Sequence, residues 1–200
     1  MVYCLLMTNM HPIPTDADLV KEIRDRWSPV IFSSREPDEA TIHALFEAAR
    51  FAPSSYNEQP WRFVYTLKSD GATRETLESL LVDGNAWAKR AGMLMISFAK
   101  KTLTKGGKPN RVALHDVGAA NFAITLQATK MGLITHQMGG FYDDKACAAV
   151  GASDDFLPAS MMVIGYPGDA SAAPEDIRKR QESARTRSDP ESFAFRGRFA

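Results

Sequence analysis

Apolar residues recur three and four positions apart in several segments of the chain, which is the spacing of an α-helix with one buried face. Residues 16–26 show this spacing behind an acidic first turn and predict a short helix. A longer helix is predicted between Pro37 and Pro53. Weaker patterns predict helices at residues 76–81 and 174–185.

Three further segments are rich in aromatic and β-branched residues and predict strands, at residues 61–67, 93–98 and 161–164. The Ser, Asn and Pro content of residues 52–60 predicts a loop, and residues 100–110 are expected to form another. Strands that alternate with helices indicate an α+β or α/β sandwich.

Residues 112–131 form a helical pattern of a different kind. Large apolar residues and alanines occupy nearly every side of the predicted helix. A helix without a polar face must lie at the centre of the domain or be covered by a second subunit. We expect a subunit interface.

Composition is that of an ordinary globular protein, with 200 residues of which 44% are hydrophobic and 24% are charged. We expect one domain over residues 16–200, preceded by a flexible or disordered segment at residues 1–15, with Met10 a possible initiator. Lys plus Arg equals Asp plus Glu at 24 each, which disfavours binding to nucleic acid or to an anionic membrane. Only two cysteines occur, Cys4 and Cys147, as is typical of a cytoplasmic protein. The apolar stretches are too short to span a bilayer, which takes about 20 residues.

Several common catalytic motifs are missing from the sequence. Neither G-x-G-x-x-G nor G-x-x-x-x-G-K-[ST] occurs, which disfavours a Rossmann or P-loop nucleotide site. The four histidines include no pair at chelating spacing, so no metal site is predicted. No G-x-S-x-G elbow supplies a hydrolase nucleophile.

Three separated segments instead carry groups suited to a planar, anionic ligand such as a phosphorylated flavin. In the first, the Arg26 guanidinium can grip a phosphate and the Ser28 hydroxyl can add a bond. In the second, the Asn57 and Gln59 amides can bind the edge of a pyrimidine-like ring. In the third, an expected loop at residues 132–141, paired glycines let backbone N–H groups approach a ligand.

Each of these segments also has a purely structural interpretation. The first can be a solvated arginine beside a serine that ends a helix, and the third can be a helix end followed by a turn. The tryptophan that follows the second segment, Trp61, is interpreted as a core aromatic, because large aromatic side chains dominate core burial.

Taken together, the segments resemble the FMN-dependent nitroreductase family and, within it, the bacterial branch of NAD(P)H nitroreductases. The resemblance rests on Arg-x-Ser at residues 26–28, Ala-Pro-Ser-x-x-Asn-x-Gln-Pro-Trp at residues 52–61, Gly-Leu-x-Thr-x-x-x-Gly-Gly-Phe at residues 132–141 and Arg-x-Arg at residues 185–187. It covers nearly the whole chain from about Asp18 to Phe199.

The resemblance implies an α+β fold, a three-layer sandwich whose central, mostly antiparallel sheet is flanked by helices. It also implies an intertwined homodimer with each FMN at the subunit interface, which agrees with the apolar helix at residues 112–131. The residues implied to bind FMN are Arg26, Trp27, Ser28, Pro53, Ser54, Asn57, Gln59, Gln137, Met138, Gly139, Gly140, Arg185 and Arg187.

Within that set the resemblance assigns individual roles. Residues 26–28 would meet the phosphate and ribityl chain, and the two arginines of residues 185–187 would reach the phosphate from the tail. Asn57 would bond the ring edge or the ribityl chain. The Gly139 N–H would face flavin N5, and Gln137, Met138 and Gly140 would form the wall behind the ring system.

One position departs from the family pattern. Members commonly carry a second basic residue where this chain has Val30, so one expected phosphate contact is missing. Arg24 or Arg35 could compensate for it.

The resemblance implies an FMN-dependent oxidoreductase that uses NADH or NADPH to reduce nitroaromatics, quinones or similar small conjugated acceptors, by ping-pong hydride transfer. No catalytic side chain is expected, since the flavin carries the chemistry, and His136 is interpreted as structural. The alternative is a flavin-binding carrier or regulatory protein without reductase activity. The sequence leaves the choice of nucleotide and the acceptor open.

Overall fold

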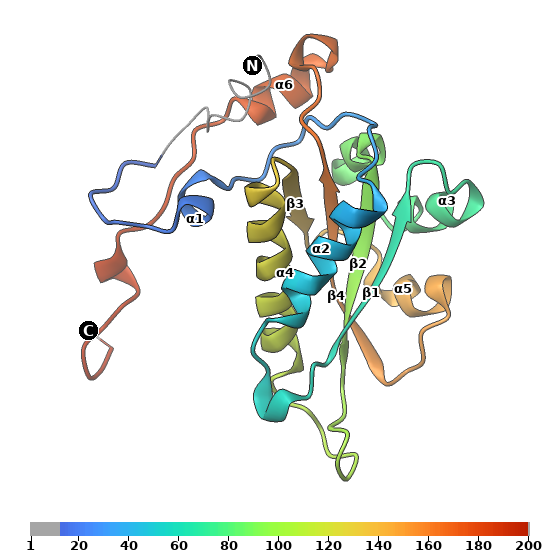
Figure 1. Cartoon of the computed structure of the whole chain (residues 1–200), viewed down its shortest axis with the longest axis vertical. Coiled ribbons are helices and arrows are strands. Elements are labelled where there is room, and N and C mark those ends of the chain that lie inside the picture. The colour runs from blue at the N-terminus through green and yellow to red at the C-terminus, as the bar shows by residue number, and fades with distance from the viewer. Residues whose placement is uncertain (1–12, 200) are drawn as a thin grey trace.

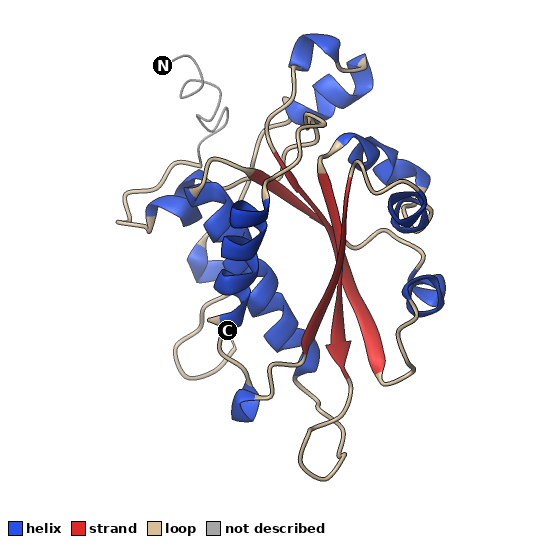
Figure 2. Cartoon of the chain, turned by 45° about the vertical axis from the view of Figure 1, so that its right-hand side comes forward, coloured by secondary structure: helices blue, strands red, loops and turns tan. Residues whose placement is uncertain are grey.

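An antiparallel sheet of four strands lies at the centre of the protein, which the computed structural model describes over residues 13–199 (Figure 1). In spatial order the strands run β1-β2-β4-β3. Their bounds are β1 Trp61–Leu67, β2 Met93–Lys100, β3 Ile134–Met138 and β4 Phe156–Gly165. Helices cover both faces of the sheet (Figure 2), so the predicted α+β sandwich with an antiparallel sheet is confirmed.

The helices divide between the two faces. The longer pair, α2 and α4, covers one face, and the short helices α3 and α5 cover the other. Two further short helices, α1 and α6, lie near the ends of the chain. The bounds are α1 Lys21–Asp25, α2 Glu39–Arg50, α3 Ala72–Glu78, α4 Ala113–Lys130, α5 Asp143–Val150 and α6 Glu175–Gln181.

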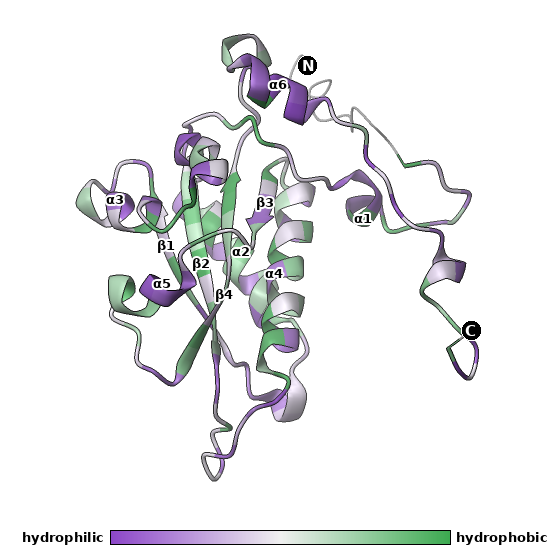
Figure 3. Cartoon of the chain, turned by 180° about the vertical axis from the view of Figure 1, so that it is seen from behind, coloured by the Kyte–Doolittle hydropathy of each residue, from purple (hydrophilic) through white to green (hydrophobic). Residues whose placement is uncertain are grey.

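Strand β2 and the C-terminal half of β4 are buried on both faces, which explains why they appear in the sequence as apolar runs. Alternate residues of a strand point to opposite faces. Met93 and Met95 therefore pack toward α2 and α4, whereas Leu94 and Ile96 pack on the other side. Figure 3 shows hydrophobic residues concentrated in β2 and β4 and hydrophilic residues in α6.

Helix α4 buries one face and exposes apolar residues on the other. Val117, Ala120 and Ile124 are fully buried against the sheet. Leu114 and Phe122, in contrast, are 49% and 42% exposed. Residues 13–199 of one chain therefore do not enclose the helix on all sides, and they leave an apolar strip uncovered.

Several predicted boundaries were wrong. Residues 132–141 were predicted to be a loop but contain β3, whose His136 and Gln137 interrupt the apolar pattern of a strand. The first helix is confined to Lys21–Asp25 and buries no residue, because so short a helix presents little apolar surface. The last helix ends at Gln181, and the tail beyond it runs away from the sheet (Figure 1).

Two further expectations concern the chain as a whole. The segment predicted to be flexible, residues 1–15, lies mostly outside the described residues, as does Met10. Among residues 13–199, no helix combines the length and apolar character that crossing a membrane demands.

Candidate functional site

Arginines from both ends of the chain meet just after α1. The Arg26 guanidinium donates a hydrogen bond to the Ser28 hydroxyl at 3.2 Å. From the tail, Arg185 Nη2 donates to the main-chain carbonyl of Arg26 at 3.0 Å. Arg187 is exposed and donates to the neighbouring Thr186 carbonyl. The structure thus unites the predicted phosphate-binding residues of the first segment with the tail.

Within residues 13–199, no acidic side chain neutralises the positive charge of this arginine cluster. Arg185 Nη1 is buried and has no hydrogen-bond partner among residues 13–199. Within residues 13–199, neither Arg26 nor Arg185 forms a salt bridge. Burial, followed by the charges of Arg185 and Arg187, lowers the pKa of Arg26, and burial together with Arg187 lowers the pKa of Arg185. An oxyanion would relieve both the desolvation and the mutual repulsion.

The segment that carries the cluster is fixed from two sides. His136 Nδ1 donates to the Pro29 carbonyl at 2.9 Å, so this nitrogen carries the hydrogen. The Val30 N–H donates to Gln181 Oε1 at 2.8 Å. Burial is the main cause that lowers the pKa of His136, and the charges of Arg180 and Arg26 lower it further. The bond from this partly buried histidine to a backbone carbonyl supports the structural interpretation of His136.

The side chain of Val30, which stands where a basic residue was expected, faces inward. Val30 is only 4% exposed and belongs to the core. The two arginines considered as replacements have partners of their own, since Arg24 pairs with Asp25 and Arg35 lies over the Tyr166 ring. The structure therefore gives no support to either compensation.

Sequence analysis missed Arg180, a further cation close to His136. Its guanidinium lies over the Trp87 ring, 5.4 Å from the centroid, and donates to the Gly84 carbonyl at 3.1 Å. His136 packs against the same Trp87 ring, and the two ring centroids are 4.7 Å apart. No local signal marks Arg180, because it is one of several basic residues in the last turn of α6.

The predicted ring-wall residues lie at the end of β3, adjacent to the segment that carries the cluster. Gln137, Gly139 and Gly140 are exposed. Met138 is 3% exposed and packs in the core, so only its backbone can face a ligand. A Cβ built on Gly139 meets nothing within 4 Å, whereas the Gly140 carbonyl accepts a bond from Asn85 Nδ2 at 2.8 Å.

Four further residues predicted to bind FMN belong to a loop between α2 and β1, namely Pro53, Ser54, Asn57 and Gln59. The Ser54 hydroxyl accepts a hydrogen bond from the Gln59 N–H at 3.0 Å, which closes the loop. Tyr56, Asn57 and Gln59 all have positive φ, a conformation that non-glycine residues rarely adopt. Trp61, directly after the loop, is 8% exposed and packs in the core, as its structural interpretation predicted.

Within one chain, this loop and the arginine cluster lie near opposite ends of α4. The loop is bonded to the first turn of α4 through Asp116, whereas α1, which precedes Arg26, packs beside the C-terminal half of α4. The helical rise places residues 116 and 130 roughly 20 Å apart along the axis. Figure 1 shows the loop below the N-terminal end of α4 and α1 beside its upper half. The predicted binding residues therefore form two separate groups.

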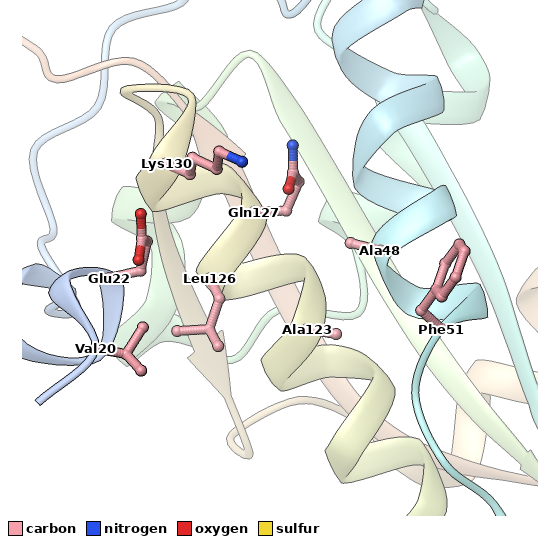
Figure 4. Close-up of a pocket in the computed structure, with 8 residues that line it drawn as sticks. All are labelled: Val20, Glu22, Ala48, Phe51, Ala123, Leu126, Gln127 and Lys130. Carbon is pink, nitrogen blue, oxygen red and sulfur yellow. The ribbon is translucent and has the colours of Figure 1, made fainter.

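A cavity of about 390 Å³ lies between α1, α2 and α4 and contains none of the predicted binding residues (Figure 4). Val20 and Glu22 of the α1 region face Leu126 across it, and Phe51 stands at the α2 side. The full lining is Val20, Glu22, Ala48, Phe51, Ala123, Leu126, Gln127 and Lys130. This mostly apolar hollow continues the uncovered strip of α4.

Comparison with known proteins identifies the family. The model of the nitroreductase family matches residues 23–91. The chain is similar to an oxidoreductase containing FMN, with 33% identity, a TM-score of 0.87 and coverage of 97% of this chain and 99% of that one. The chain therefore belongs to the nitroreductase family.

Two curated relatives also match. An uncharacterised 15.4 kDa protein of Mycolicibacterium smegmatis is 36% identical over 127 residues, which are 64% of this chain and 84% of the relative. A protein of Archaeoglobus fulgidus, whose name pairs NADH dehydrogenase with NAD(P)H nitroreductase, is 25% identical over 156 residues, which are 76% of this chain and 87% of the relative.

Proposed function

We propose that the protein is an FMN-dependent oxidoreductase that uses NADH or NADPH to reduce nitroaromatics, quinones or similar conjugated acceptors. The observation that carries the proposal is the arginine cluster, where the buried Nη1 of Arg185 has no partner within the described part of the chain. Arg185 is bonded to Arg26, which is bonded in turn to Ser28. A phosphate monoester supplies negative charge and offers several acceptor oxygens to these donors at once. The structural relative that contains FMN supports the same ligand.

The residues present fit FMN as follows. Arg26, Ser28, Arg185 and Arg187 would hold the phosphate. The exposed backbone at Gly139 would lie against the ring system, since no side chain there prevents close approach. The chemistry that FMN would supply when bound is two-electron transfer between NAD(P)H and the acceptor, which would occupy the site in turn.

The chain's own contribution is to bind and orient the cofactor. No general acid or base is assigned, because the cofactor carries the chemistry. The main-chain N–H of Gly139 would supply a dipole at the reacting edge of the ring, and Arg180 would add positive charge beside the cluster. His136 would keep residues 26–29 in place through its bond to the Pro29 carbonyl.

A second copy of the chain would complete each site. The Ser54–Gln59 loop and the arginine cluster lie near opposite ends of α4. A two-fold axis across the middle of α4 would bring the loop of one copy to the cluster of the other. It would also cover Leu114, Phe122 and the neighbouring hollow, which one chain leaves exposed. The homodimer and the split site are thus parts of one proposal.

The proposal is tested by the visible absorption spectrum of the purified protein, before and after anaerobic addition of NADH and then of NADPH. We expect a flavin spectrum that one or both nucleotides bleach, and steady nucleotide oxidation once an acceptor is added. A flavin spectrum that neither nucleotide bleaches would favour a carrier or regulatory protein. A protein that binds no added FMN would contradict the proposal altogether.

A further inference from the structure

Asp116 in the first turn of α4 carries a carboxylate that is almost fully enclosed. The residue is 2% exposed. Its Oδ2 accepts a hydrogen bond from the Ser55 N–H at 3.0 Å, and its Oδ1 lies 3.0 Å from Nδ1 of the largely exposed His115 ring. A carboxylate is rarely enclosed without a structural or functional reason, and this one faces the Ser54–Gln59 loop.

The loop has a conformation that it would not keep by itself. Tyr56, Asn57 and Gln59 have φ of 52°, 55° and 46°, each in the left-handed region that costs energy for residues with a side chain. Strain of this kind persists only where surrounding contacts fix the backbone. Tyr56 is 90% exposed, so packing of its side chain does not supply them.

Asp116 supplies the contact from outside. Within residues 13–199, the other side-chain bonds to the backbone of this loop come from Ser54, Gln59 and Arg62, which belong to the loop or to the strand that follows it. The Asp116 carboxylate is the contact that ties the loop backbone to a helix of the core. Thr104 also anchors the loop, by donating its N–H to the Glu58 side chain.

We propose that Asp116 is a positioning residue that holds the Ser54–Gln59 loop in the conformation that binds FMN. This inference rests on the proposed function. Without the carboxylate, the strained residues would relax and only a fraction of molecules would have the binding conformation. The apparent affinity for FMN falls by that fraction. The role is exerted through Ser55, so Asp116 itself need not touch the cofactor.

Substitutions at Asp116 separate the hydrogen bond from the charge. Asp116→Ala removes the acceptor, and we expect the Kd for FMN to rise about tenfold or more. Asp116→Asn keeps one oxygen that can accept the Ser55 N–H, and we expect a change within about threefold. Turnover per bound flavin should stay within about twofold of wild type in both variants. His115→Ala is the matched control, because it leaves the bond to Ser55 intact.

A second variant approaches the same bond from the donor side. Ser55→Pro removes the N–H at the first position of a 3-10 turn, where proline is tolerated. We expect its effect on FMN affinity to match that of Asp116→Ala, and the double variant to lose little more. This variant keeps the test available where Asp116→Ala fails to fold.

Hydrogen–deuterium exchange without flavin gives an independent readout. The amides of residues 54–59 should exchange faster in Asp116→Ala than in wild type, and Asp116→Asn should restore slow exchange. Faster exchange with unchanged FMN affinity would overturn the positioning role, as would an Asp116→Asn variant as impaired as Asp116→Ala. Wild-type protein that binds no FMN would instead overturn the proposed function and this role with it, even if the exchange data show that the carboxylate holds the loop.

Discussion

Arg185 donates a hydrogen bond to the main-chain carbonyl of Arg26 at 3.0 Å, although the two residues are 159 positions apart in the sequence. The bond uses Nη2, and the buried Nη1 has no partner in the part of the chain that the structure describes. One guanidinium therefore joins the tail to the segment after α1 and also presents an unused donor within the arginine cluster.

Loss of the Arg185 side chain should weaken FMN binding more than loss of Arg187. We expect Arg185→Ala to raise the Kd for FMN about tenfold to a hundredfold, since charge-assisted bonds to a phosphate are lost. Arg187→Ala should have a smaller effect with the dimer intact, because its side chain is exposed and donates to the neighbouring Thr186 carbonyl. Fluorescence titration of FMN measures both. Arg198→Ala, an exposed arginine of the same tail, is the control, and an equal loss in that variant would contradict the assignment.

Two inactive variants should complement each other if each site draws on two chains. Arg185→Ala damages the cluster, and Asn57→Ala damages the loop. A mixed dimer contains one site with both wild-type residues and one with neither. Random co-assembly should therefore restore FMN to about a quarter of all sites. Flavin content of the co-expressed pair measures this, and recovery no greater than that of the separate variants would mean that the residues do not act across a subunit interface.

A charge on the outward face of α4 should dissociate the dimer. We expect Phe122→Lys to shift the protein toward monomer and to lose FMN in parallel, because an unpaired ammonium would be buried in the interface. Phe122 is 42% exposed and Tyr142, on the opposite side of the sheet, is 40% exposed. Tyr142→Lys is thus matched in exposure and should leave the oligomeric state unchanged. Sedimentation velocity distinguishes the two, and equal behaviour would argue against α4 as the interface.

Substitution of the two glycines after β3 should affect different properties, namely FMN affinity at Gly139 and stability at Gly140. A Cβ on Gly139 meets nothing within 4 Å, so Gly139→Ala should leave the Tm unchanged and weaken FMN binding. A Cβ on Gly140 comes within 3.1 Å of Asn85 Nδ2 and 3.3 Å of Val82 Cγ2. Gly140→Ala should therefore cost about 1 kcal/mol of stability, or about 2–4 °C in Tm. Thermal unfolding and FMN titration separate the effects, and a stability loss confined to Gly139→Ala would reverse the assignment.

Acidification should destabilise the protein through His136. Burial is the main cause that lowers its pKa in the folded state from the ordinary value of 6.5. At a pH between the folded and the unfolded pKa, the unfolded chain therefore binds more protons than the folded protein. Stability from this group is complete above about pH 6.5 and is lost as pH falls through the folded pKa. His136→Gln, whose amide can donate to the Pro29 carbonyl, should flatten the dependence of Tm on pH between about 7 and 5. The exposed His43→Gln variant should retain the wild-type slope, and a flattened slope there would contradict the assignment.

Local pattern in the sequence determined much of the fold. Apolar spacing located α2 and α4, and dense apolar runs located β1, β2 and β4, because burial is periodic along a helix or strand. The same pattern missed β3, a five-residue strand with polar residues in its interior. Arg26 and Ser28 were also found in the sequence, since phosphate recognition needs guanidinium and hydroxyl groups, whereas Arg185 was found through the resemblance to the nitroreductase family.

Only the tertiary structure decided which of these residues meet. The bond from Arg185 to the carbonyl of Arg26 and the bond from the Ser55 N–H to the Asp116 carboxylate join segments that are distant along the chain. The inward position of Val30 depends on which way the backbone turns. The separation of the Ser54–Gln59 loop from the arginine cluster follows from the length of α4, which sets the two groups near its opposite ends. Residue type records what a side chain can bind, whereas the path of the backbone determines which groups lie within bonding distance.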